Sequence, residues 1–163
     1  MTRLAEGILP EGEPSRAEVL ARAGEQWQLA GDPARAVQLF RQAIADGGRT
    51  GIDPRASLAD ALFEVGEAAE ARDVLAALRA EPRLSPATCL TAAETLMAQG
   101  DLRATQDWAT EGVRAAHGGE CGPEGVELLG QLLRLRFRCR SDLGLPEDDY
   151  DRMLDAGTFK ASQ

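Results

Sequence analysis

The sequence is poor in positive charge and in large aromatic side chains. Its 18 basic residues are outnumbered by 27 acidic ones, which gives a net charge of −9. This balance argues against a nucleic-acid backbone or an anionic membrane surface as the main partner. With only four Phe, two Trp and one Tyr, the core has to be built from closely packed small side chains, and the many alanines favour helices.

Cysteine and long apolar runs are also scarce. The three cysteines, Cys89, Cys121 and Cys139, are scattered and include no Cys-x-x-Cys pair, so neither a disulfide framework nor a zinc ribbon is indicated. No segment approaches the roughly twenty apolar residues of a membrane-spanning helix, and the first ten residues contain no signal-peptide block. We therefore expect a soluble cytoplasmic protein.

Motifs for catalysis and cofactor binding are missing as well. The single histidine, His117, lies in a glycine-rich segment, and no serine or cysteine has a nucleophile motif around it. The phosphate-binding motifs Gly-x-x-x-x-Gly-Lys and Gly-x-Gly-x-x-Gly do not occur, and the only lysine is Lys160. A metal site would have to gather His117 and the three cysteines from separate segments. The sequence therefore predicts no enzyme activity, no cofactor and no metal.

A repeat of about 34 residues is the main positive signal. Gly31-Asp32, Gly66-Glu67 and Gly100-Asp101 lie 35 and 34 residues apart. Each is preceded at the same offsets by a small residue and a larger apolar one: Gly24 and Trp27, Ala59 and Leu62, Ala93 and Leu96. Such a period predicts a series of helical hairpins.

Capping residues and prolines locate the helices. Ser15 begins a capping box, and Asp32, Asp53 and Ser85 each precede a proline at the first helical position. We predict helices over residues 16–30, 33–46, 54–65, 67–80, 86–99, 101–116, 123–142 and 146–156.

The segment 133–140 alternates apolar and basic residues, which by period alone is a strand. A lone strand would leave its backbone groups unpaired, so we interpret the segment as helical. One apolar stripe then contains Leu128, Leu132, Leu135 and Cys139, and an adjacent one contains Leu129, Leu133 and Phe137. The acids that follow, Asp148, Asp149, Asp151 and Asp155, are expected to pair with the arginines of this helix rather than leave them free for RNA or phosphate.

These residues resemble the tetratricopeptide repeat family. The first unit fits with Leu20, Gly24, Trp27, Gly31-Asp32, Ala36, Phe40 and Ala43, and the second with Leu58, Ala59, Leu62, Gly66, Ala71 and Leu75. In the third unit, an ungapped register places Thr105, Ala109 and Gly112 at the small positions of the second helix. A register with one deletion places Ala104 and Trp108 at motif positions instead. Trp27 and Phe40 are expected in the core, and an ungapped register would expose Trp108 as an interface.

The resemblance implies an all-α, right-handed superhelical solenoid of antiparallel helix pairs. We expect the chain to begin with a mobile tail over 1–14, followed by three hairpins over 15–117. A C-terminal hairpin or cap over 118–156 and a disordered tail over 157–163 complete the expected organisation.

In this family the first helix of each pair lines a concave groove that binds a peptide. The resemblance places at the groove Glu18, Ala21, Glu25 and Gln28, then Asp53, Ala56, Asp60 and Phe63, then Ala87, Leu90, Glu94 and Met97. The family's chaperone-binding clamp grips a terminal carboxylate with lysine, arginine and asparagine side chains in the groove. None of these residue types occupies the groove positions here, so a chaperone carboxylate is not expected as the ligand.

Glu25, Asp60 and Glu94 repeat the spacing of the glycines without lying at a helix end. The same spacing relates a second set of acids, Asp32, Glu67 and Asp101. These three occupy helix N-termini, where an acid has a capping role. The mid-helix column predicts an acidic groove for a basic or amphipathic peptide. A solvated helix face is the alternative explanation.

The function that follows is a non-catalytic scaffold or adaptor that binds another protein. The alternative is a regulatory or sensory helical-repeat domain that recognises a small ligand, or that forms a homodimer through apolar residues near 123–156.

Overall fold

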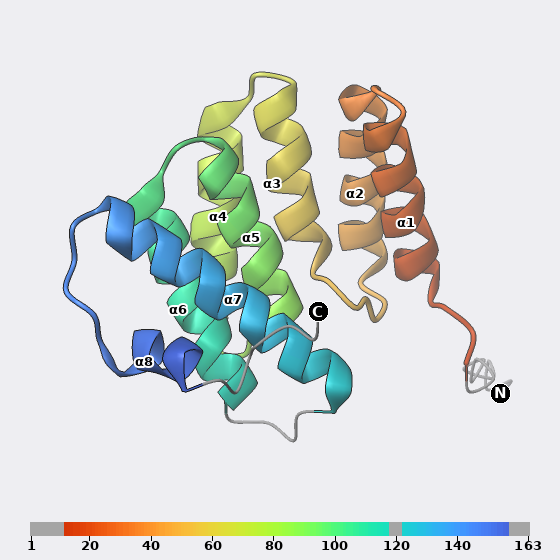
Figure 1. Cartoon of the computed structure of the whole chain (residues 1–163). Helices are drawn as coiled ribbons and strands as arrows, with labels where there is room; N and C mark the ends of the chain where they lie inside the picture. The colour runs from red at the N-terminus through yellow and green to blue at the C-terminus, as the bar shows by residue number, and fades with distance from the viewer. Residues whose placement is uncertain (1–11, 118–121, 157–163) are drawn as a thin grey trace, which may run out of the picture.

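The structure, a computed structural model, describes residues 12–117 and 122–156. This part of the chain contains helices and no strand (Figure 1). The helices are α1 (Arg16–Leu29), α2 (Pro33–Asp46), α3 (Pro54–Glu64), α4 (Ala68–Arg79), α5 (Pro86–Ala98), α6 (Leu102–His117), α7 (Pro123–Asp142) and α8 (Asp149–Asp155). Most of the two expected tails, and Cys121 with them, lie outside the described residues.

The helices begin where the capping residues predict. The side chain of Ser15 accepts a hydrogen bond from the backbone N–H of Glu18, and Ser85 and Asp53 cap α5 and α3 in the same way. The alternating segment lies within α7, so its helical interpretation is confirmed. The last helix starts at Asp149 rather than at 146, because Asp148 and Asp151 form a reciprocal capping box there.

Each repeated glycine makes the same turn. Gly31, Gly66 and Gly100 have φ values of 87°, 87° and 74°, in the left-handed region that strains other residues. The chain thus reverses in the same way after α1, α3 and α5, which is the physical reason for the glycine period.

Successive helices pack side by side and build a row of hairpins. α1 packs on α2, α3 on α4 and α5 on α6, while α3 also contacts α1 and α5, and α5 contacts α7. Figure 1 shows α1 and α2 at one end of the row and α7 and α8 at the other. The architecture is an all-helical repeat of the tetratricopeptide type, as the sequence predicts.

Small residues bring the helices close together. Ala36, Ala59, Ala71 and Ala93 are fully buried, and a Cβ on Gly24 would lie 2.7 Å from the Phe40 ring. Phe40 is fully buried, as predicted. The core therefore depends on close approach of helices more than on large anchors.

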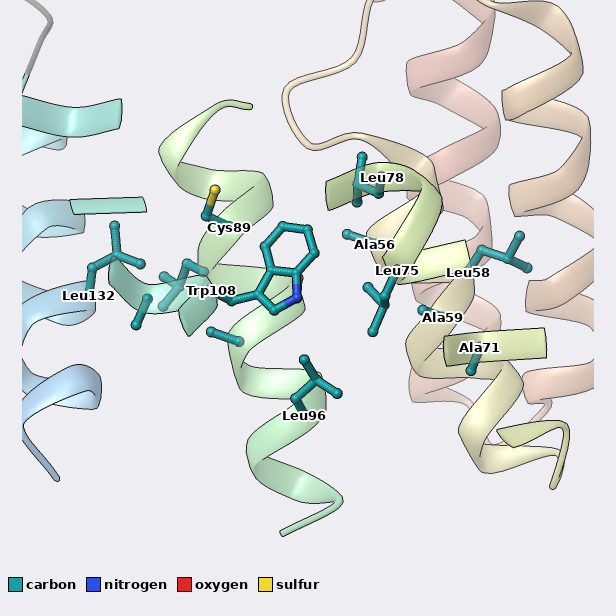
Figure 2. Packing of buried hydrophobic residues seen from close by; sticks show 14 of the residues in the cluster. Ala56, Leu58, Ala59, Ala71, Leu75, Leu78, Cys89, Leu96, Trp108 and Leu132 are labelled. Carbon is teal, nitrogen blue, oxygen red and sulfur yellow. The ribbon is translucent and has the colours of Figure 1, made fainter. Parts of the chain in front are cut away.

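Trp27 differs from the prediction, whereas Trp108 has the burial that the one-deletion register predicts. Trp27 is 39% exposed and lies under the guanidinium of Arg35, 4.5 Å from the ring centre. Trp108 is only 5% exposed, although Thr105 and Ala109 are buried as the ungapped register requires. Its indole points toward the side chains of Leu75 and Leu78 of α4 (Figure 2), and the guanidinium of Arg79, also of α4, lies 5.6 Å from the ring centre.

The end of α7 also differs from the expected apolar stripes. Phe137 is 39% exposed, and Arg136 is buried in its place, with 3% exposure. Arg136 pairs with Asp148 and Asp151, and Arg140 pairs with the same two acids. The expected pairing of arginines with the following acids is thus present for these two residues, and it attaches α8 to α7.

Candidate functional site

A hollow of about 450 Å³ lies along the first helices of the three hairpins. Most of its lining comes from α1 and α3, with α5 at one edge. The lining residues are Glu25, Gln28, Leu29, Ile52, Ser57, Asp60, Glu64 and Thr91. Three of the predicted groove residues, Glu25, Gln28 and Asp60, are therefore brought together. We call this site the acidic hollow.

Gln28 links the two sides of the acidic hollow. Its Nε2 donates a hydrogen bond to Asp60 Oδ2 at 2.6 Å and a second one to Glu64 Oε1. One neutral amide nitrogen from α1 is thus shared by two carboxylates of α3. Hydrogen bonds to ionised acceptors are among the stronger ones in proteins, so this contact orients both acids.

Two members of the predicted acidic column, Asp60 and Glu94, influence each other electrostatically. Desolvation raises the pKa of Glu94 from its ordinary value, and the charge of Asp60 raises it further. The pKa of Glu25 is also raised, by desolvation and by Glu18, although Arg22 opposes the shift. Glu94 and Asp60 therefore repel each other across the joint between α3 and α5.

Arginine does not pair with these acids in the part of the chain that the structure describes. Glu25, Asp60, Glu64 and Glu94 form no ion pair there. Acids elsewhere do pair with arginine, and examples are Glu70 with Arg41, Glu81 with Arg55 and Glu111 with Arg79. Three of these four acids, Glu25, Asp60 and Glu64, line the acidic hollow.

Two predicted groove residues have structural contacts outside the acidic hollow. Glu18 accepts a hydrogen bond from the backbone N–H of Gly51 and pairs with Arg22 at 2.9 Å. Asp53 caps α3 and pairs with Arg55 at 2.8 Å. Burial raises the pKa of Asp53, but the hydrogen bonds and charge of Arg55 outweigh it, so the pKa is lowered overall.

The three predicted apolar groove residues belong mainly to helix packing. Leu90 is buried in the core. Phe63 packs against the core with the guanidinium of Arg72 at 5.7 Å from its ring centre. Met97 Sδ lies 3.9 Å from Cys139 Sγ, across the contact between α5 and α7. The structure does not bring these side chains into the acidic hollow.

Sequence reasoning missed five lining residues: Leu29, Ile52, Ser57, Glu64 and Thr91. Glu64 could have been found, because it follows Asp60 by four residues and so shares its helix face. Ile52 could not, since it lies before α3 and its place depends on how the segment between α2 and α3 folds.

The match to known proteins covers the centre of the fold. Residues 29–87 match the family model described as Tetratricopeptide repeat. This part of the chain is similar to a tetratricopeptide repeat. It spans α2, α3 and α4, and it contributes Leu29, Ile52, Ser57, Asp60 and Glu64 to the acidic hollow. No curated protein and no solved structure matches the chain.

Two of the cysteines considered for metal binding have a packing role. Cys89 and Cys139 are fully buried free thiols, and burial raises the pKa of Cys89 to about 11. Within the described ranges, no three His, Cys, Asp or Glu side chains are grouped closely enough to hold a metal ion. None of the helices there is both long and apolar enough to cross a membrane.

Proposed function

We propose that the protein is a tetratricopeptide repeat adaptor that binds a basic or amphipathic segment of another protein along the face formed by α1, α3 and α5. The observation that carries the proposal is a set of acids without an ion pair that line one hollow together with apolar side chains. Glu25, Asp60 and Glu64 line the acidic hollow together with Leu29 and Ile52. A segment with lysine or arginine beside apolar side chains complements both parts.

Charge supports a protein segment of this kind over other ligands. Because the acids lack arginine partners, an incoming cation gains attraction without breaking an existing ion pair. The chain as a whole is also acidic, at −9, which favours encounter with basic partners. This role requires no catalytic group, and it suits the reducing cytoplasm that the cysteines favour.

The proposal can be tested with a synthetic ligand. We expect a fluorescein-labelled amphipathic leucine–lysine peptide to bind, with weaker binding at about 300 mM salt than at about 50 mM. A leucine–glutamate peptide of the same pattern should not bind. Reversing two charges, with Asp60→Lys and Glu94→Lys, should weaken binding at least about tenfold. The matched control reverses two acids away from this face, Glu70→Lys and Glu127→Lys.

Equal loss of binding in both double variants would mean that only net charge matters. Unchanged binding after reversal at Asp60 and Glu94 would contradict the groove proposal. Circular dichroism of each variant establishes that it remains folded.

Self-association is a second candidate, supported by a different surface. Val126 and Phe137 of α7 are 42% and 39% exposed. They are eleven residues apart, close to three helical turns, so they share one side of α7. A homodimer through this face would show twice the chain mass in light scattering, and Phe137→Asp would restore the single-chain mass. A single-chain mass for the unmodified protein at all concentrations would exclude this candidate.

A further inference from the structure

The amide of Gln28 lies between two carboxylates, at a point that favours a cation. Its nitrogen lies between the carboxylates of Asp60 and Glu64 and gives one N–H to each. The amide is neutral, so it satisfies the hydrogen bonds and leaves both negative charges uncompensated. An ammonium or guanidinium group at the same point would make the same bonds and also neutralise charge.

The surroundings fit the stem of a long basic side chain. Leu29, which is 82% exposed, lines the acidic hollow together with Ile52 and Thr91. Lysine and arginine carry a chain of methylene groups behind the charged end, and such stems pack on apolar surface. The volume of about 450 Å³ is ample for one such side chain.

We propose that one lysine or arginine side chain of the partner enters between α1 and α3, displaces the Gln28 amide, and takes over its hydrogen bonds to Asp60 and Glu64. The stem of that side chain covers Leu29 and Ile52. This proposal rests on the proposed function and adds to it a specific subsite and a displaced group. Acidic and neutral polar side chains are rejected there, since they would bring either repulsion or no compensation of charge.

Nuclear magnetic resonance can observe the displaced group directly. The chain contains eight glutamines and no asparagine, and the side-chain amide signals of Gln28 are assigned by their loss in Gln28→Met. On titration with the leucine–lysine peptide, these signals should move to the position of a free, solvated amide. The amide of Gln106, which donates to Thr110 on the same helix α6, should not move.

Substitution of Gln28 gives an independent test by peptide affinity. Gln28→Lys places a cation from the chain itself between the two acids, so we expect binding about tenfold weaker. Gln28→Met keeps the stem and removes the donor, so binding should be equal or a few-fold tighter. Gln42→Lys, on the exposed side of α2, adds the same charge away from the site and is the control.

The outcomes separate the two proposals. If the peptide binds but the Gln28 signals stay in place, or if Gln28→Lys weakens binding no more than Gln42→Lys, the subsite is wrong and the adaptor function stands. If the peptide does not bind the unmodified protein at all, the adaptor function fails and this inference fails with it.

Discussion

Arg136 and Asp151 form an ion pair that is almost completely removed from water. Arg136 Nη1 lies 2.8 Å from Asp151 Oδ1, and both side chains are 3% exposed. Arg136 Nε also donates a hydrogen bond to Thr110 Oγ1 at 2.9 Å, and the guanidinium lies 5.1 Å from the centre of the Tyr150 ring. One arginine of α7 thus joins α6 and α8.

Breaking this pair should destabilise the protein strongly. Asp151→Ala leaves the guanidinium of Arg136 buried with less compensation, and we expect a loss of about 3 kcal/mol in the free energy of unfolding. Urea denaturation measures it. Asp149→Ala is the control, because Asp149 is 98% exposed in its pair with Arg152 and such pairs contribute little. Equal losses in the two variants would contradict the importance of burial here.

Acid should weaken the attachment of α8 through Asp148. Hydrogen bonding from Arg136 is the largest cause that lowers the pKa of Asp148 from 3.8 to about 2, against an opposing effect of burial. The folded-state pKa is the lower one, so the stabilisation is complete above about pH 4 and is lost as the pH falls toward 2. Urea denaturation of the unmodified protein and of Asp148→Asn should therefore differ at pH 5 and converge near pH 2. A difference independent of pH would contradict this assignment.

Glu94 should affect stability and binding in opposite directions. Desolvation and the charge of Asp60 raise its pKa, so folding disfavours the ionised form of Glu94 relative to the unfolded chain. Glu94→Gln removes that repulsion and should raise the melting temperature slightly, while it weakens binding of the leucine–lysine peptide. Such opposition is common at functional sites.

The matched control for Glu94 is Glu111→Gln, which removes an acid paired with Arg79 at 3.0 Å. That change should lower the melting temperature or leave it unchanged, and it should not affect peptide binding. A lower melting temperature for Glu94→Gln would show that Glu94 has a stabilising role after all.

The two tryptophans should differ in access to solvent. Trp27 is 39% exposed and Trp108 is 5% exposed, so single-tryptophan variants report on each environment. With Trp108→Phe, the fluorescence of Trp27 should be quenched readily by acrylamide. With Trp27→Phe, the fluorescence of Trp108 should be protected until the protein unfolds. Similar quenching of both would contradict the packing of Trp108 between α6 and α4.

Much of the local structure is predictable because it depends on neighbours in the chain. Ser15 and Asp53 cap helices with groups two or three residues away, and the repeated glycines set the turns through their own φ angles. The candidate site is partly predictable for the same reason. The period of the repeat is enough to place Glu25, Asp60 and Glu94 on equivalent helix faces.

The remaining features depend on contacts between distant segments. Apolar character predicts that Trp27 is buried, yet the neighbouring helices leave it 39% exposed. The repeat spacing leaves two registers open for Trp108, and only the packing of the helices buries it. Alternation along α7 does not show that Arg136 turns inward, because its partners, Asp148 and Asp151, lie at the start of another helix.

The sequence by itself determined the helices, their turns and the repeat, since these follow from local hydrogen bonding and periodicity. Only the tertiary structure decided that the Gln28 amide lies between Asp60 and Glu64 beside Leu29 and Ile52. That arrangement depends on the distance and angle at which α1 packs beside α3, and these are set by side chains spread over several helices rather than by any one segment.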